Sequence, residues 1–244
     1  MRTKIRLLPL LLAASLFFLS PMAALSDTPA LRGYDPIIKY QYVTFGEYPT
    51  QKDGTREPTL WRVLGVQDGV ALLMTEYIID FLTYNDVKDK DLQNPLAYAD
   101  SLIRKTSNEQ CVNDLFTEAE KACLVEMADG RGLLSVANLD ELRNKDHGFF
   151  ATNYTVDKRR QGQGTPYAKS LGLQNIDGTG NSWYWTTEWR KPGYRWIVGD
   201  NGHISTSGID RKGGYRPVCY VRMDLLTAQG GGGEKTDPLR LKAR

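Results

Sequence analysis

The sequence predicts an α+β protein with a small, twisted antiparallel sheet and helices inserted between its N-terminal and C-terminal strands. Short apolar runs separated by turn residues occupy residues 37–74 and 183–222. Between them, residues 96–143 carry apolar side chains at helical spacing. Strands, then helices, then strands are typical of α+β proteins. We therefore expect the first and last strands to share one sheet.

The N-terminal strands are predicted by apolar runs over residues 37–45, 60–66 and 70–74. Asp68-Gly69 lies between the last two runs and predicts a tight hairpin, because glycine accepts a positive φ without a steric penalty. Apolar residues alternate onto both faces of residues 60–66, so we expect this hairpin to be covered on both sides.

The middle of the chain is predicted to be helical. A first helix is expected over residues 96–103. Thr117 and Glu120 have the spacing of a capping box, which predicts a helix from Glu118 to about Met127. Further short elements are expected as a strand at 133–136, a helical turn at 139–143 and, from Thr165, Pro166 and Gly172, a helix at 165–172.

Residues 1–26 have the pattern of a secretory signal peptide. Three basic residues precede the apolar run Leu7 to Leu19, and Ala24-Leu25-Ser26 offers small residues for cleavage before Asp27. The alternative, a membrane anchor, is disfavoured because the run is short and Pro21 interrupts it. We expect an exported bacterial protein, periplasmic or extracellular, without a transmembrane anchor.

The mature chain is expected to form one domain over residues 37–226. Removal of residues 1–26 with their three basic side chains changes the formal net charge from +2 to −1, so nothing favours nucleic acid as a partner. Residues 227–244 contain a glycine run and many charges with few apolar side chains. This composition predicts a disordered tail.

Three cysteines, Cys111, Cys123 and Cys219, follow the predicted signal peptide. Export permits a disulfide between Cys111 and Cys123, which flank a helix boundary, but two separate buried thiols fit the same spacing. Cys219 lies in a predicted central strand, where we expect a buried, unreactive thiol.

The aromatic cluster Trp183-Tyr184-Trp185-Thr186-Thr187-Glu188-Trp189 is the first candidate site. The three tryptophans have the same parity along a strand, which places them on one face of a regular sheet. Such a face is either core or a stacking platform for sugars or peptides. We assign Trp183 and Trp185 to the core. Trp189 and Tyr194, beside the loop Arg190–Gly193, are the exposed candidates.

Polar side chains gather at the ends of the same strands. Glu188, Asp200, Asn201, Asp210 and Arg211 could bind a ligand, and oxygen-rich loops of this kind can hold calcium. Asp200-Asn201-Gly202 is also what a turn requires, and no motif supports calcium or any other cofactor.

Basic residues are dense in the same region: Arg190, Arg195, Arg211, Arg216 and Arg222. They could receive a carboxylate or phosphate of a ligand. For Arg216, before Pro217, we favour a structural role, paired to a carboxylate that points inward.

Enzyme signatures are mostly absent from the sequence. The two histidines, His147 and His203, lack the spacing of zinc ligands, and neither a phosphate-binding loop nor a nucleophile elbow is present.

Several ordered motifs carry a resemblance to a family of bacterial domains of unknown function, the DUF6273 family. The chain over residues 38–225 resembles that family at FGEYP (45–49), LWRVL (60–64), SLIR (101–104), LFTEAEK (115–121), LLS (133–135), YAKSLG (167–172) and WYWTT (183–187). The closing strands look like those of C-type-lectin-like folds, which include relatives of the formylglycine-generating enzymes.

The resemblance implies a C-type-lectin-like domain that binds a ligand on loops above the tryptophan strands, at about residues 144–181 and 190–194. The chain lacks the calcium-dependent sugar motifs of lectins and the closely spaced cysteine pair of the formylglycine-generating enzymes. Our hypothesis is an exported domain that binds a glycan, a cell-wall fragment or a protein. The alternatives are a structural module of an envelope assembly and an envelope enzyme with Glu188 or Asp200 as acid or base.

Overall fold

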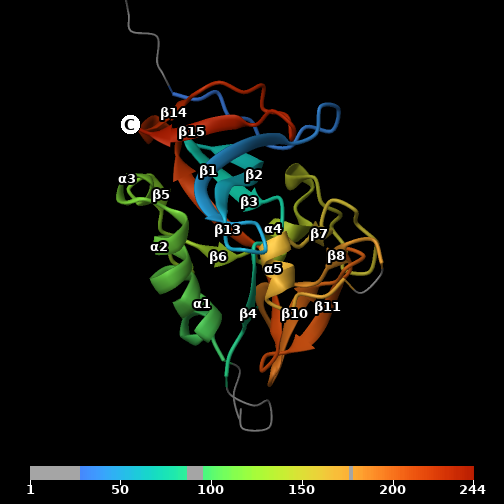
Figure 1. Ribbon diagram of the computed structural model, residues 1–244. Coiled ribbons are helices and arrows are strands. Elements are labelled where there is room, and N and C mark those ends of the chain that lie inside the picture. Colours follow the sequence, from blue (N-terminus) through green and yellow to red (C-terminus); the bar gives the residue numbers. More distant parts are fainter. Residues whose placement is uncertain (1–27, 87–95, 176–177) are drawn as a thin grey trace, which may run out of the picture.

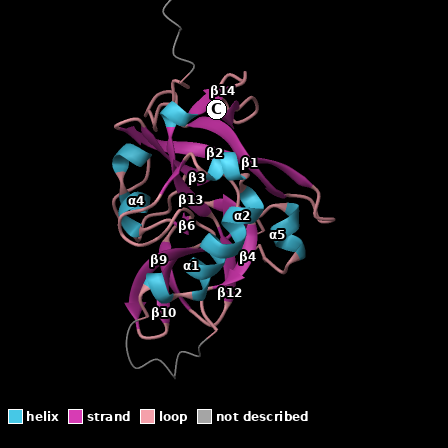
Figure 2. Ribbon diagram, turned by 90° about the vertical axis from the view of Figure 1, so that its left-hand side faces the viewer, coloured by secondary structure: helices cyan, strands magenta, loops and turns pink. Residues whose placement is uncertain are grey.

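The computed structural model describes residues 28–86, 96–175 and 178–244. The predicted signal peptide, residues 1–26, lies outside this part of the chain. Within it, strands dominate and helices are few and short (Figures 1 and 2). The α+β prediction is confirmed at this level. No helix in the described ranges combines the length and the apolar character needed to cross a membrane.

An eight-stranded sheet forms the upper half of the molecule in Figure 1. Its strands follow the order β14-β15-β1-β2-β3-β13-β5, and β6 also pairs with β13. The strands are β1 (Gln41–Pro49), β2 (Arg56–Gln67), β3 (Val70–Thr75), β5 (Leu124–Val125), β6 (Ser135–Val136), β13 (Pro217–Arg222), β14 (Leu226–Ala228) and β15 (Leu239–Ala243). Because β13 pairs with β3, the first and last predicted strands do share one sheet.

The β2–β3 hairpin forms as its sequence predicts. Asp68 and Gly69 take φ of 50° and 77°, the left-handed conformation that a two-residue hairpin turn requires. Trp61 faces one hydrophobic cluster, and Leu64 faces the other. The prediction of a hairpin covered on both faces is therefore confirmed, and the sheet lies in the middle of the core.

A second sheet of five strands lies below the first and takes up the tryptophan region (Figure 1). Its order is β11-β10-β9-β12-β4, from β4 (Asp80–Thr83), β9 (Tyr184–Lys191), β10 (Tyr194–Val198), β11 (Ile204–Gly208) and β12 (Lys212–Tyr215). A separate pair joins β7 (Gly162–Gln163) to β8 (Asn181–Ser182). The prediction of one small antiparallel sheet is thus wrong. Strands β9 to β12 belong to the second sheet, and β13 returns to the first. Strands β1 and β15 pair in parallel, and so do β9 and β12.

The C-terminal segment is ordered, so the prediction of a disordered tail at 227–244 is wrong. Strand β15 pairs with β14 and, in parallel, with the edge of β1. Leu241 is 7 % exposed and belongs to the hydrophobic core. Two apolar side chains at alternate positions, Leu239 and Leu241, suffice because β1 offers unpaired backbone groups for β15 to complete.

The helices are short: α1 (Leu102–Thr106), α2 (Val112–Leu115), α3 (Glu118–Lys121), α4 (Leu139–Arg143) and α5 (Pro166–Ser170), with a π-helical turn at Ser107–Cys111 and 3₁₀ turns at Tyr98–Asp100, Lys145–His147 and Met223–Leu225. The Thr117–Glu120 capping box is present, but its helix ends at Lys121 and the chain continues as β5. The helix expected at 96–103 begins later, at Leu102, behind the Ser101 cap. Helices α4 and α5 form where predicted.

All three cysteines are free and buried, so no Cys111–Cys123 disulfide forms. Cys111 lies beside Tyr48, whose hydroxyl is 4.0 Å from its Sγ. Cys123 donates to the Ala119 carbonyl at 3.4 Å. The two thiols therefore serve different neighbours on either side of α2 and α3, and the alternative of separate buried thiols holds for both.

Candidate functional site

The tryptophans do not form a single platform. Trp185 is fully buried and donates from Nε1 to the Leu82 carbonyl at 2.9 Å. Trp183 packs edge-on against it, with ring centroids 4.9 Å apart. Trp189 is 41 % exposed. The assignment of Trp183 and Trp185 to the core and of Trp189 to the surface is confirmed. The even spacing of the three tryptophans does not place them all in the same environment, because irregularities interrupt the β9–β10 register.

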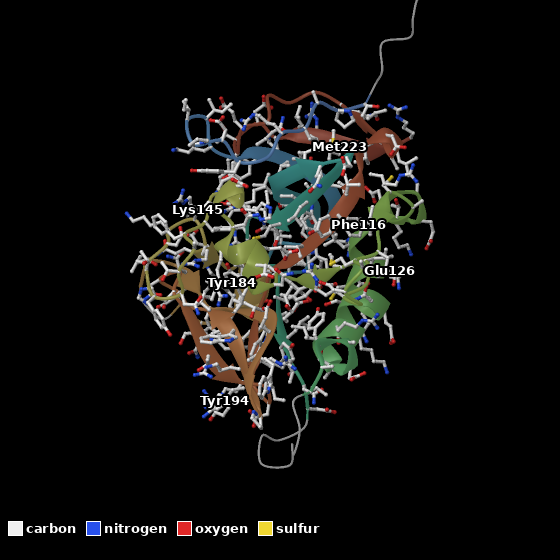
Figure 3. The ribbon with its side chains drawn as sticks, turned by 180° about the vertical axis from the view of Figure 1, so that it is seen from behind. Phe116, Glu126, Lys145, Tyr184, Tyr194 and Met223 are labelled. Atoms are coloured by element: carbon white, nitrogen blue, oxygen red, sulfur yellow. The ribbon has the colours of Figure 1, made fainter. Side chains whose placement is uncertain are left out.

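Trp189 and Tyr194 lie at the end of the β9–β10 hairpin. In Figure 3, Tyr194 marks the tip of this hairpin and Tyr184 its inner end. The Arg190 guanidinium lies 5.2 Å from the centroid of the Trp196 ring, and the Lys191 ammonium 4.4 Å from that of Tyr194. These side chains therefore cover one another at a projecting tip.

The predicted polar residues are divided among three places. Asp200 and Asn201 form the β10–β11 turn, where Asp200 Oδ1 accepts from the Asn201 amide at 3.0 Å and Asn201 Oδ1 from the His203 amide at 3.0 Å. They serve the turn. Asp210 and Arg211 lie at the other end of these strands, exposed in the β11–β12 turn.

Glu188 has a structural contact. Its Oε1 accepts from the Leu139 amide at the start of α4 at 2.6 Å, while Oε2 is buried without a partner. Burial raises the pKa of Glu188. Arg195 lies buried nearby and donates to the carbonyls of Thr187 and Leu96. A raised pKa is a property of many catalytic acids and bases. The Glu188 carboxyl, however, does not line any of the four described cavities.

Arg216 is structural, as expected, but it does not pair with a carboxylate. It is fully buried, its Nε donates to the Thr75 carbonyl at 2.9 Å, and its Nη1 donates to the carbonyls of Arg160 and Gln161 at 3.0 Å. The guanidinium also lies 5.2 Å from the centroid of the Tyr184 ring. It ties both sheets to the loop before β7.

None of the eight predicted ligand residues lines a described cavity: Glu188, Trp189, Arg190, Tyr194, Asp200, Asn201, Asp210 and Arg211. The largest cavity, about 650 Å³, lies beside the β2–β3 turn and His147. A more enclosed one, about 450 Å³, lies between β2 and the start of α5, and we call it the α5 pocket. Its lining is Tyr48, Thr50, Gln51, Glu57, Pro58, Thr59, Leu60, Tyr77, Ile79, Gln163, Gly164, Thr165 and Pro166.

Backbone hydrogen bonds fix the walls of the α5 pocket. The Thr165 amide donates to the Ile78 carbonyl and the Ile78 amide to the Gln163 carbonyl, each at 2.9 Å. The Tyr167 amide donates to the Thr50 carbonyl at 2.9 Å, which joins α5 to the end of β1. The cap, proline and glycine that predicted α5 from the sequence therefore also position one wall of this pocket.

Thr59 lines the α5 pocket and has an unsatisfied hydroxyl. The residue is 3 % exposed, and its Oγ1 has no hydrogen-bond partner in the structure. A buried hydroxyl without a partner costs free energy, so it is a site that a ligand atom can satisfy. Glu57, the sole charged residue in the described lining, already accepts from Thr50 Oγ1 at 2.6 Å and Gln51 Nε2 at 3.1 Å.

Beneath the pocket, the Tyr48 hydroxyl donates to Asp80 Oδ2 at 2.6 Å. Burial raises the pKa of Asp80, and it also raises the pKa of Cys111 to about 12. Asp80 further accepts from its neighbour, the Phe81 amide, at 2.6 Å. The carboxyl is thus occupied on both oxygens, and the pair holds the Tyr48 ring in place as the pocket floor.

The part of the chain that the structure describes contains no group of three or more His, Cys, Asp or Glu side chains placed to hold a metal ion. The described residues therefore offer no candidate set of ligands for the calcium ion considered from the sequence.

The α5 pocket was missed from the sequence because its residues are scattered from β1 to α5 and are ordinary in type. One signal points to it. The motif FGEYP supplies Tyr48 and the motif LWRVL supplies Leu60, so two of the motifs behind the family resemblance meet at this pocket.

Comparisons with known proteins give no match: no family model, no curated protein and no solved structure corresponds to this chain.

Proposed function

We propose that the protein is an exported ligand-binding domain, related to the DUF6273 family and of C-type-lectin-like architecture, that holds a neutral sugar unit of a saccharide in the α5 pocket. The observation that carries the proposal is that Thr59, which lines a concave pocket, has a buried hydroxyl without a partner. Pockets of this size, with apolar walls and a few converging polar groups, are typical ligand sites.

The chemistry of the lining supports a saccharide. Tyr48 and Tyr77 supply aromatic walls, on which the apolar face of a sugar ring packs. Gln51, Gln163 and Thr59 supply amide and hydroxyl groups that match sugar hydroxyls as donors or acceptors. Since Glu57 is already occupied by two neighbours, the pocket has no free charge that would favour an ionic ligand.

The experiment is a calorimetric titration of neutral oligosaccharides, including cell-wall fragments, into the wild-type protein and a Thr59→Val variant. Valine keeps the shape of threonine and removes the hydroxyl. We expect affinity to fall about tenfold, the equivalent of about 1.4 kcal/mol for one buried hydrogen bond.

The fold should be unaffected, because the hydroxyl has no partner in the free protein. Tyr77→Ala should weaken binding further, and Trp189→Ala, which changes an aromatic residue at the hairpin tip, is the matched control. Failure of every neutral saccharide to bind, or equal affinity for wild type and Thr59→Val, would overturn the proposal.

A further inference from the structure

A second cavity, about 450 Å³, is lined by cations and tyrosines with no acidic side chain among its lining residues. We call it the anion pocket. It lies between the turn 35–39, which projects at the upper right of Figure 1, and residues 158–159. Its cations are Lys39, Arg62, Lys158 and Arg159, and its tyrosines are Tyr34, Tyr40 and Tyr42.

Two of these cations are already compensated. Arg62 donates from Nε to Glu76 Oε2 at 2.7 Å, and from Nη1 to the Arg159 carbonyl at 2.7 Å. Arg159 lies 3.4 Å from Asp157 Oδ1 through its Nε and donates from Nη1 to the Tyr34 hydroxyl at 2.9 Å. Asp157 also lies 3.6 Å from Arg160, so one carboxylate serves two guanidinium groups.

The two lysines form no ion pair within the part of the chain that the structure describes. Lys158 is exposed and has no ion pair or hydrogen bond among the described residues. The Lys39 ammonium donates to the Pro36 carbonyl at 2.6 Å, which leaves its charge unpaired. Asp35, in the same turn, accepts from the amides of Ile37 and Ile38 at 2.7 and 2.8 Å and interacts with Lys39 electrostatically without a direct contact. The pocket therefore carries an excess of positive charge.

Of the tyrosines, Tyr42 adds a neutral donor. The Tyr40 hydroxyl donates to the His147 carbonyl at 2.8 Å, and burial raises the pKa of Tyr40 to about 12, so the phenol keeps its proton. The Tyr42 hydroxyl has no hydrogen-bond partner within the described ranges, and burial raises its pKa also. It is thus a free donor beside the cations.

Residues of β2 line both the anion pocket and the α5 pocket. Arg62 and Leu60 are alternate residues of this strand and share a face, and Leu60 lines the α5 pocket. Lys235 bridges the two: its ammonium bonds Glu76 Oε1 at 2.8 Å and lies 5.0 Å from the centroid of the Tyr77 ring. β2 and Lys235 thus link residues of the two pockets.

We propose that the anion pocket binds a phosphate or carboxylate group, and that the ligand of the protein is an acidic saccharide whose charged group occupies this pocket. Lysine ammonium groups bind such oxyanions through charge-assisted hydrogen bonds. The assignment of the saccharide rests on the proposed function of the α5 pocket, whereas the oxyanion site stands on the geometry of its own residues.

The test is a calorimetric titration of inorganic phosphate, and separately of acetate, into the full chain at constant ionic strength. Variants are Lys158→Gln and Lys158→Glu, with Lys105→Gln, an exposed lysine of α1, as the matched control. We expect Lys158→Gln to weaken binding severalfold, Lys158→Glu to weaken it at least tenfold, and Lys105→Gln to leave it unchanged. Binding should also weaken as salt increases. The stronger of the two probes identifies the oxyanion.

Absence of binding by both probes, or equal binding to wild type and Lys158→Glu, would overturn the oxyanion site. Thr59→Val must leave phosphate affinity unchanged, because Thr59 lines the α5 pocket and does not line the anion pocket. A protein that binds neutral saccharides through Thr59 but ignores both oxyanions therefore refutes this inference and keeps the proposed function. The reverse result refutes the proposed function and keeps the oxyanion site.

Discussion

Arg62 and Glu76 form a buried ion pair across the β2–β3 hairpin, with Arg62 Nε 2.7 Å from Glu76 Oε2. They are 5 % and 9 % exposed, and the other carboxylate oxygen of Glu76 accepts from Lys235 at 2.8 Å. Burial alone would raise the pKa of Glu76, but the charges of Arg62, Arg216 and Lys235 outweigh it and lower that pKa. The carboxylate thus joins the hairpin to the C-terminal segment.

Glu76→Ala is expected to lower the free energy of unfolding by about 3–5 kcal/mol, because it leaves the Arg62 guanidinium buried without its counter-charge. Urea denaturation near neutral pH measures the loss. The control is Glu118→Ala, since that carboxylate is 91 % exposed and its pair with Lys121 is worth at most about 1 kcal/mol. Equal effects of the two substitutions would contradict the importance of the buried pair.

The same carboxylate predicts an acid limb of the stability profile. A carboxyl whose folded pKa lies below its unfolded pKa contributes stability above the unfolded value, and loses it as pH falls through the folded value. For Glu76 the loss begins near its ordinary pKa of 4.5 and continues below it. Denaturation at a series of acidic pH values should show a smaller decrease for Glu76→Gln than for wild type.

Glu188 should have the opposite effect. Burial raises the pKa of this carboxyl, so the folded state prefers the protonated form. Its contribution is fully present below the unfolded pKa and is lost as pH rises through the folded pKa. Glu188→Gln keeps an oxygen to accept from Leu139 and carries no charge, so its stability relative to wild type should increase between acidic and neutral pH. Denaturation at both pH values tests this, and an unchanged difference would contradict it.

The hairpin and the short helices were predictable because their signals are local. Asp68-Gly69 fixes a turn by backbone conformation, and the Thr117–Glu120 box and Thr165-Pro166 fix helix starts by hydrogen bonds within three residues. The length of the helix after Thr117 was not predictable, because Leu124 is drawn into pairing with Val221 of β13. A tertiary partner there overrides the helical pattern.

The C-terminal strand illustrates the same limit. Its composition resembles that of a disordered tail, and what orders it is the edge of β1, Glu76 and the core. Leu241→Ala is expected to lower the free energy of unfolding by about 2–3 kcal/mol, by removing buried methyl groups. Thermal denaturation measures the change, with exposed Lys242→Ala as the control. If Leu241→Ala were as neutral as Lys242→Ala, the segment would not be docked.

The thiols give a direct chemical test. With Cys111, Cys123 and Cys219 free and buried, a thiol reagent should react with none of them in the native protein and with all three after denaturation without reductant. Burial also raises the pKa of each thiol, which further suppresses the reactive thiolate. A single reactive thiol in the denatured protein would instead demonstrate a disulfide.

The candidate site was harder to predict than the fold. The sequence draws attention to dense aromatics and charges, and these are largely engaged: Trp185 in the core, Asp200 in a turn and Glu188 on α4. The α5 pocket depends on an ordinary threonine whose hydroxyl lacks a partner, a property that arises only when β2 and α5 are brought together. Such a property has no sequence signature.

Substitutions of the two tryptophans of β9 distinguish a site in the α5 pocket from a platform at the hairpin tip. Trp185→Ala is expected to lower the free energy of unfolding by about 3–5 kcal/mol, because it empties a fully buried position and removes the bond to Leu82. Trp189→Ala should change it by less than about 1 kcal/mol, since the ring is 41 % exposed. Urea denaturation distinguishes them. Since the Trp189→Ala variant should remain folded, its saccharide affinity decides where the site lies. A site in the α5 pocket predicts the affinity of the wild type. A platform at the hairpin tip predicts complete loss of binding.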